Sequence, residues 1–193
     1  YLYRAFYALP HLKNNSGSHT GAIFGVTNMI NKLINDLSPK YICAVFDARG
    51  KNFRHRLYKD YKSNRKSMPE ELSEQVDPIF DFLKFMGIQI IQQPDVEADD
   101  VIASLVNDHT SKTKILISSG DKDLAQLVNK NVQLINSLDG KQLNEGDVKK
   151  KFGVAPNQIK DYLTLVGDAS DNIPGVSKIG PKTAVTLLKK YHS

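Results

Sequence analysis

The chain has 193 residues, of which 40% are hydrophobic, so it can bury a core of one domain with a smaller appended region. Its single cysteine, Cys43, excludes an intrachain disulfide and a zinc site built on thiolates. No run approaches the roughly 18 apolar residues needed to span a bilayer, so we expect no membrane partner. The single cysteine fits a reducing compartment, and we expect a cytoplasmic location, nucleoid-associated if the source is bacterial. The net charge of +5 favours a polyanionic partner.

Helices and strands alternate in the first part of the chain. Apolar residues recur at helical spacing over 20–37, and a short buried strand, YICAVFD, follows. The next helix is expected to begin near Pro69, kink at Pro78 and stop at Gly87. The remaining elements before residue 136 are strands at 88–91, 114–118 and 132–135 and helices starting at 97 and at 122. This order predicts an α/β fold with a mostly parallel sheet and helices on both faces.

The pattern changes after SLDGKQL, which predicts a hairpin turn. Helical segments are expected from Asn144 onward, and IPGVSKIG is expected to form a loop between the last two. We therefore divide the chain into domains at 1–136 and 137–193.

A basic segment runs from Arg49 to Lys66. It holds eight Lys or Arg residues against one acid, Asp60, with Phe53, Tyr58 and Tyr61 between them. Cations can hold phosphates and aromatic rings can stack on bases, which favours a nucleic-acid contact. The alternative is a solvated, mobile loop, because charge runs are commonly that.

Carboxylates follow the predicted strands. Strand YICAVFD ends on an acid, three acids crowd onto the first turn of the helix after 88–91, and two follow strand 114–118; two more stand in VGDASDN. The carboxyl ends of parallel strands meet at one edge, so the first six are expected to converge. These acids are Asp47, Glu97, Asp99, Asp100, Asp121 and Asp123, joined in the second region by Asp168 and Asp171.

Any one of these acids could be a helix cap or a turn residue. Together they would repel one another unless cations neutralised them. Oxygen ligands without clustered His or Cys suit Mg²⁺ or Mn²⁺, and the spacing is not that of a calcium-binding EF-hand loop. Two such ions could clamp the oxygens of a phosphodiester displacement.

The stretch DNIPGVSKIGPKTA offers a second phosphate-binding element. Glycine lets backbone approach a phosphate closely, and the helix that opens at Pro181 supplies free N–H groups. The alternative is an ordinary connection between two helices.

Four motifs in order carry a resemblance: VFDARGKNFRHRLYKDYKSNR, VEADD, SSGDKDLAQL and GDASDNIPGVSKIGPKTA. The chain resembles the 5′-nucleases of the flap endonuclease superfamily and is most similar to the N-terminal 5′→3′ exonuclease domain of bacterial DNA polymerase I. The resemblance covers essentially the whole chain. It implies a PIN-like α/β domain, a helical arch over about 49–86, and a helix–hairpin–helix module within 137–193.

The resemblance also implies roles for individual residues. The first of two Mg²⁺ or Mn²⁺ ions would bind Asp47, Glu97, Asp99 and Asp100. The second would bind Asp121, Asp123, Asp168 and Asp171. Asp47 also counts as catalytic, together with the arch residues Tyr61, Lys62 and Arg65 that meet the scissile phosphate. DNA would further contact Arg54, Gly175, Lys178, Gly180, Lys182 and Thr183, with K⁺ as a candidate ion at the hairpin.

The function implied is that of a structure-specific 5′→3′ exonuclease and 5′-flap endonuclease that removes primers and flaps in DNA replication and repair. We expect a monomer that acts on DNA with 5′ ends or flaps, and a polymerase region is a candidate for the rest of the parent chain. The family begins with a strand whose Asp binds metal and continues beyond the hairpin for several helices, so we expect this chain to be a fragment. Two alternatives stay open: a non-catalytic module that binds branched DNA, and a PIN-type ribonuclease.

Overall fold

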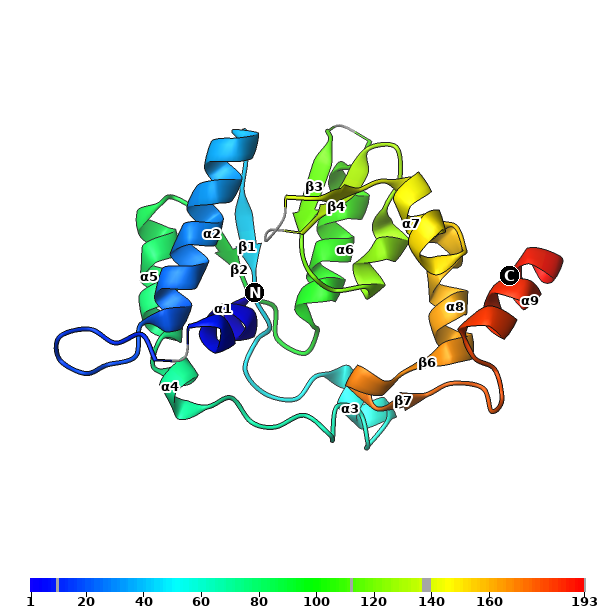
Figure 1. Ribbon diagram of the computed structural model, residues 1–193, viewed down its shortest axis with the longest axis horizontal. Helices are drawn as coiled ribbons and strands as arrows, with labels where there is room; N and C mark the ends of the chain where they lie inside the picture. Colours follow the sequence, from blue (N-terminus) through cyan, green and yellow to red (C-terminus); the bar gives the residue numbers. More distant parts are fainter. Residues whose placement is uncertain (10, 112, 137–139, 193) are drawn as a thin grey trace. The chain divides into compact units, whose positions relative to one another are not determined.

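The computed structural model describes residues 1–193 except 10, 112, 137–139 and 193. The chain divides into two compact units (Figure 1). The first unit comprises Tyr1–Asp47 and Lys66–Gln93, and the second comprises Ala48–Arg65 and Pro94–Ser193. Each unit has its own cluster of buried hydrophobic side chains. Within the described ranges, no helix combines the length and the apolar character needed to cross a membrane.

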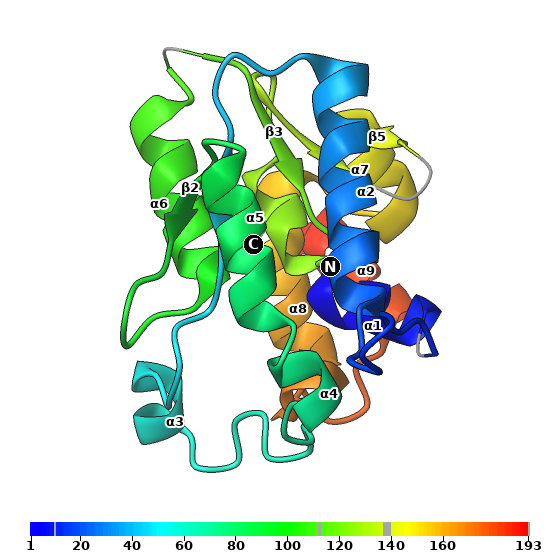
Figure 2. The same cartoon turned by 90° about the vertical axis from the view of Figure 1, so that its left-hand side faces the viewer.

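Helices pack on a parallel strand pair in the first unit. Strands β1 and β2 pair in parallel, with Ala44 opposite Ile90. Helix α2 packs against α1 and α5, and α5 packs against β2 (Figure 2). The core of the unit includes Leu72, Ile79 and Leu83. The elements are α1 (Leu2–Ala8), α2 (Gly21–Leu37), β1 (Cys43–Val45), α4 (Glu70–Ser73), α5 (Val76–Phe85) and β2 (Gln89–Ile91).

Two predictions for the first unit need correction. The apolar run at 41–47 is not a fully buried strand, since Cys43 is exposed and Ala44 and Val45 are half-buried; apolar content alone does not tell how many faces of a strand are covered. The helix expected around Pro78 is two helices, α4 and α5. A proline ring clashes with the carbonyl four residues back, and here the helix breaks at Glu74 and Gln75. Pro78 then falls in the first turn of α5, where an N–H is not needed.

The second unit contains a three-stranded sheet with the order β3-β4-β5. Strand β4 pairs with β3 in parallel and with β5 in antiparallel orientation. Fully buried Val132, Val148 and Ile159 join β4, α7 and α8 in one core, and each such side chain contributes about 1.5–3 kcal/mol to stability. The elements are α3 (Phe53–Leu57), α6 (Ala98–His109), β3 (Ile115–Ser118), η1 (Asp123–Leu127), β4 (Val132–Ile135), β5 (Gln142–Leu143), α7 (Glu145–Phe152), η2 (Pro156–Gln158), α8 (Ile159–Val166), β6 (Gly167–Asp168), η3 (Ala169–Asp171), β7 (Ile173–Pro174) and α9 (Pro181–Tyr191), where η marks a 3₁₀ helix.

The predicted α/β class with parallel strands is confirmed by the pairs β1–β2 and β3–β4. The antiparallel β4–β5 pair agrees with the hairpin expected at SLDGKQL, although 137–139 lie outside the described residues. The loop expected at 173–180 differs, since its first two residues form β7 and pair with β6. Gly167 and Gly175 allow this pairing, because a side chain on Gly175 would stand 2.3 Å from the backbone of Val166.

Candidate active site

The start of α6 brings Glu97, Asp99 and Asp100 onto one turn. Glu97 is the N-cap residue, and its backbone N–H donates to Asp100 Oδ2 at 2.9 Å. The helix-cap reading of these acids is therefore correct for Asp100. It does not account for the side chain of Glu97, which points to other partners.

Arg54 forms a two-point ion pair with Asp100. Its Nη1 and Nη2 atoms lie 2.6 and 2.7 Å from Asp100 Oδ2 and Oδ1. The hydrogen bond from Arg54 holds the pKa of Asp100 below its usual value. Such paired geometry is the strongest form of the arginine–carboxylate contact. The basic segment therefore folds back onto the acids of its own unit.

The Glu97 carboxylate receives three donors from the same segment. Lys62 Nζ and Asn52 Nδ2 each lie 2.7 Å from Oε1, and the Tyr61 hydroxyl lies 2.9 Å from Oε2. Burial acts to raise the pKa of Glu97, but the hydrogen bonds from Lys62 and Tyr61 outweigh it, and the pKa is lowered. Glu97 is thus held as a carboxylate.

Tyr61 and Lys62 also reach the last predicted acid, Asp171. The Tyr61 hydroxyl lies 3.0 Å from Asp171 Oδ2, and Lys62 Nζ lies 3.8 Å from the same atom. Tyr61 is only 5% exposed, and burial together with the contact to Glu97 raises its pKa. The phenol therefore stays protonated and donates. The structure thus places Glu97 and Asp171 on either side of one hydroxyl group.

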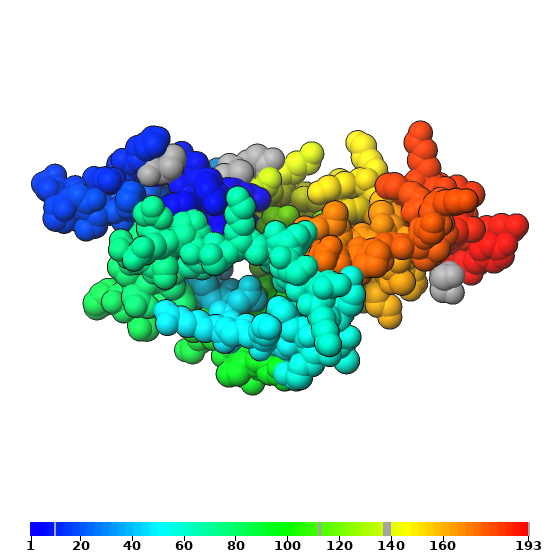
Figure 3. Space-filling model, turned by 90° about the horizontal axis from the view of Figure 1, so that it is seen from below, coloured from blue at the N-terminus to red at the C-terminus, as the bar shows by residue number. Residues whose placement is uncertain are grey.

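Segments 60–65 and 169–172 are joined by further hydrogen bonds. Arg65 pairs with Asp171, the Lys62 N–H donates to the Asp171 carbonyl at 3.0 Å, and Asn64 Nδ2 donates to the Ala169 carbonyl at 2.8 Å. In Figure 3 turquoise atoms of this part of the chain lie against orange atoms of the turn. The basic segment is therefore not a solvated loop at this point.

A second group of acids surrounds η1. Asp121 Oδ1 accepts from the Asp123 N–H at 2.9 Å, and Lys122 Nζ lies 3.1 Å from Asp168 Oδ1. Asp168 is 8% exposed and also accepts from the Ser170 N–H and hydroxyl. Burial would raise the pKa of Asp168, but the Ser170 and Lys122 contacts outweigh it and the pKa is lowered.

Asp123 is the least satisfied member of this group. Its Oδ1 atom is buried and, within the described structure, has no hydrogen-bond partner. Burial and the neighbouring charges of Asp121 and Asp168 raise the pKa of Asp123 to about 6. A buried carboxylate oxygen without a donor beside other carboxylates is an environment suited to a cation.

The structure brings seven of the eight predicted acids into the second unit, while Asp47 follows β1 in the first unit. There its backbone oxygen accepts from Gln92 Nε2 at 3.1 Å. In the part of the chain that is described, no three His, Cys, Asp or Glu side chains approach closely enough to hold one metal ion. The carboxylates instead turn toward the cations Arg54, Lys62, Arg65 and Lys122.

The predicted hairpin residues lie between β7 and α9. Lys178 adopts a positive φ of 65°, and Gly180 is the N-cap residue of α9 with open space where a side chain would stand. Lys182 and Thr183 are exposed on the first turn of α9. At Gly175 a side chain would collide with the backbone of Val166. Glycine is therefore needed at this position whether or not a ligand binds.

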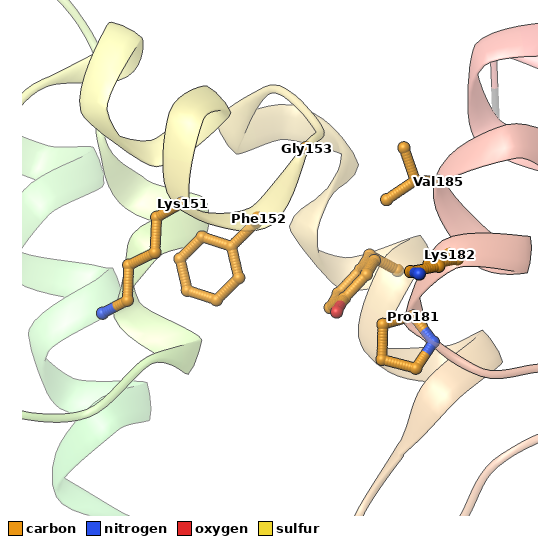
Figure 4. Close-up of a pocket in the computed structure, with 7 residues that line it drawn as sticks. Lys151, Phe152, Gly153, Pro181, Lys182 and Val185 are labelled. Atoms are coloured by element: carbon orange, nitrogen blue, oxygen red, sulfur yellow. The ribbon is translucent and has the colours of Figure 1, made fainter.

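A cavity of about 350 Å³ lies beside this hairpin, between α7, α8 and α9. Figure 4 shows the Phe152 ring facing the gap toward Pro181, while Lys151 points away from it. The side chains that line the cavity are mainly apolar or aromatic and include no acid. The cavity therefore differs in its lining from the two groups of acids, and none of the predicted acids belongs to it.

Sequence reasoning missed three polar contributors: Asn52, Lys122 and Ser170. Asn52 stands at the N-cap of α3, where its side chain accepts from the Arg54 N–H. An Asn before a short helix is a recognisable capping signal, but it does not reveal the contact with Glu97, 45 positions away. In the sequence, Lys122 between two acids looks like an ordinary exposed lysine. Only the structure shows its ion pair with Asp168.

Comparison with known proteins gives the family. The profile of the 5′-3′ exonuclease N-terminal resolvase-like domain matches residues 1–153, and that of the 5′-3′ exonuclease C-terminal SAM fold matches residues 154–193. A 5′-3′ exonuclease of Aquifex aeolicus is 46% identical over all of this chain and 67% of its own length. DNA polymerase I of Pseudomonas aeruginosa is 46% identical over 97% of this chain but only 21% of its own length.

Solved structures agree on the fold. The T5 D15 protein co-crystallised with metal ions has a TM-score of 0.72 at 24% identity, covering 87% of this chain and 67% of that protein. A T5 5′-exonuclease with zinc bound has a TM-score of 0.75 at 22% identity, covering 98% of this chain and 72% of that protein. The chain spans about two thirds of the separate exonucleases it matches and about a fifth of the polymerases. On the strength of the two profiles and these relatives, the chain belongs to the 5′-3′ exonuclease family.

Proposed function

We propose that this chain carries the active site of a structure-specific 5′→3′ exonuclease and 5′-flap endonuclease that hydrolyses DNA with divalent metal ions. The observation that carries the proposal is the junction at Tyr61 and Lys62, which contact both Glu97 and Asp171. Residues suited to phosphate binding thereby meet residues suited to metal binding. A solved pseudo-enzyme–product complex of the T5 D15 flap endonuclease contains DNA and metal ions, which supports DNA and divalent metal ions as ligands here.

The acids supply the oxygen donors that divalent metal ions prefer, although no three of them among the described residues stand close enough to hold one ion as they are. The donors are all oxygens, and Asp123 Oδ1 is buried without a protein donor. Asp121, Asp123, Asp168 and Asp171 would hold one ion, and Glu97, Asp99 and Asp100 would hold the other. For Asp47, which belongs to the first unit, a metal role is implied by the family resemblance alone. Mg²⁺ or Mn²⁺ is the proposed species; when bound, the two ions would supply the positive charge that activates water and stabilises the charge growing on the phosphate.

The side chains of the basic segment have separate tasks in this proposal. Lys62 and Arg65 carry the charges that can contact the scissile phosphate, since both already lie at the carboxylates that flank it. Tyr61 keeps its proton and fixes Glu97 and Asp171 relative to each other. Arg54 holds Asp100 and continues the cationic surface on α3.

The hairpin is proposed to bind duplex phosphates. Open space at Gly180 allows an oxygen to approach the backbone, and Lys178, Lys182 and Thr183 can contribute polar contacts nearby. Gly175 keeps the turn tight, and K⁺ is the proposed ion at this turn.

The wider assignments remain proposals as well. We retain a division at 1–136 and 137–193, a monomer that acts on DNA with 5′ ends or flaps in replication and repair, and a cytoplasmic location. A polymerase region in the parent chain is supported by the relatives named DNA polymerase I.

Cleavage and binding of a 5′-flap duplex, measured on one substrate, test the proposal. We expect cleavage in Mg²⁺ or Mn²⁺ but not in EDTA. Asp121→Asn or Asp99→Asn should remove most cleavage and leave flap binding largely intact, because the metals act on the transition state while cations and hairpin hold the substrate. Asp108→Asn, an exposed acid on α6, is the matched control and should cleave normally.

Other outcomes identify the alternatives. Tight flap binding without cleavage under any metal condition would indicate a non-catalytic branched-DNA-binding module. Preferential cleavage of a single RNA strand would indicate a PIN-type ribonuclease.

A further inference from the structure

Asn52 is a buried polar side chain that no part of the proposed chemistry uses. It is 7% exposed and belongs to the same unit as Glu97. Its Oδ1 atom accepts from the Arg54 N–H at 3.1 Å, and its Nδ2 atom donates to Glu97 Oε1 at 2.7 Å. One amide therefore caps α3 and holds the carboxylate at the start of α6.

The Arg54 N–H and the Glu97 carboxylate set the orientation of this amide, whose Oδ1 atom also lies 2.8 Å from His55 Nδ1. Turning it over would place Oδ1 against the Glu97 carboxylate and Nδ2 against the Arg54 N–H, so both contacts would become repulsive. The side-chain Nδ2 group of Asn52 therefore faces Glu97, because its Oδ1 atom caps α3.

Asn52 differs in charge from the cations at the same carboxylate. Lys62 Nζ lies 2.7 Å from Glu97 Oε1 and Arg54 Nη1 lies 4.0 Å from Oε2, and both repel a divalent ion. A neutral amide does not. It occupies one lone pair of Oε1 and restricts the rotation of the carboxylate, so a metal ion can bind Oε1 by displacing Lys62 from its other lone pair while the Asn52 contact stays.

We propose that Asn52 is a positioning residue that holds the Glu97 carboxylate in the orientation in which it binds a divalent metal ion. The inference rests on the proposed function, because it takes Glu97 as a metal-binding residue. Hydrogen-bond partners of metal-binding side chains change metal affinity by roughly 10- to 100-fold when removed. Asn52 should therefore act on metal affinity, beyond its part in the cap.

Asn52→Ser separates the capping of α3 from the hydrogen bond to Glu97. Serine caps a helix about as well as asparagine but is too short to reach Glu97. Asn144 caps α7 in the same way, accepting from the Asp147 N–H at 3.1 Å, so Asn144→Ser is the matched control. Mn²⁺ affinity is measured by titration calorimetry, and stability by urea unfolding in EDTA. Asn52→Thr, which keeps a capping hydroxyl and fills more volume, serves as a second variant if the serine protein is poorly folded.

We expect Asn52→Ser to raise the Mn²⁺ Kd roughly 10-fold or more, while Asn144→Ser leaves it unchanged. In a Glu97→Gln background, Asn52→Ser should add nothing, because its effect passes through the carboxylate. Unchanged affinity in Asn52→Ser, with Glu97→Gln clearly weakened, overturns the inference and leaves the proposed function standing. Unchanged affinity in Glu97→Gln itself overturns the metal role of Glu97, and the inference with it.

Discussion

Tyr61 donates its phenolic hydroxyl toward Asp171, 110 positions further along the chain, at 3.0 Å. The same oxygen lies 2.9 Å from Glu97. A single phenol proton cannot satisfy two carboxylates at once, so the two acids depend on the adjacent charge of Lys62 for compensation. This arrangement joins the start of α6 to the turn after α8 through one buried side chain.

Tyr61→Phe should lower the free energy of unfolding by about 1–3 kcal/mol, because the one buried phenolic proton that Glu97 and Asp171 share is lost while the ring and its edge contact with His55 remain. Urea unfolding in EDTA measures the change. Tyr58→Phe, a more exposed tyrosine in the same segment, should differ from the wild type by less than about 0.5 kcal/mol. Equal effects of the two substitutions would show that the Tyr61 hydroxyl does not hold the acids together.

Lys62→Ala and Arg65→Ala should each slow single-turnover cleavage of a 5′ flap by roughly 10²-fold or more if the cations stabilise the charge that develops on the phosphate. Lys59→Ala removes an exposed lysine from the same segment and should leave the rate close to that of the wild type. Normal cleavage by both Lys62→Ala and Arg65→Ala would remove these residues from the catalytic assignment.

Asp123→Asn should stabilise the protein at pH 7.5 in EDTA. The folded-state pKa of about 6 lies above the usual 3.8, so ionising Asp123 at neutral pH costs folding free energy. Since the side chain is partly exposed, solvent screening reduces the gain to about 1 kcal/mol.

The gain from Asp123→Asn should shrink as the pH falls from 7.5 to 5. Below about pH 6 the folded wild type takes up the proton, so its disadvantage relative to the asparagine variant decreases, and it is fully lost only below the ordinary pKa of 3.8. Paired urea unfolding curves at the two pH values measure the difference, with Asp108→Asn as the control that should show no such trend. A gain that stays constant with pH would mean that Asp123 is not ionised against its neighbours.

The sequence was sufficient for the main alternation of strands and helices and for the family, because periodicity, prolines and motif order are local properties. It did not predict the short elements α1, α3, β6 and β7. It predicted which acids stand at helix starts, and Asp100 does cap α6. It could not predict how charges pair. Arg54 and Asp100 are 46 positions apart, and their contact exists only because α3 and α6 are folded against each other. The contact of the buried Asn52 with Glu97 likewise depends on packing between segments that no local pattern describes. The break before Pro78 is local, but the sequence did not tell a kink from a full break.

Mg²⁺ or Mn²⁺ at millimolar concentration should raise the melting temperature. An ion that binds only the folded state stabilises it by about 2.7 kcal/mol at a concentration of 100 times Kd. Mn²⁺ should act at lower concentration than Mg²⁺, since it binds such ligands more tightly and loses its water more readily. Thermal unfolding followed across a metal titration measures both effects.

The substitution that best tests the source of this shift is Asp99→Asn. Sequence reasoning alone would choose the double change of Asp99 and Asp100 and expect it to stabilise the metal-free protein by relieving repulsion. The structure argues otherwise for Asp100, because its carboxylate pairs with Arg54 and accepts from the Glu97 N–H, so Asp100→Asn should destabilise. Asp99→Asn leaves those contacts in place and should reduce the metal-induced shift. If the wild type melts at the same temperature in EDTA and in excess Mn²⁺, the crowded acids at the start of α6 serve only as caps and ion-pair partners.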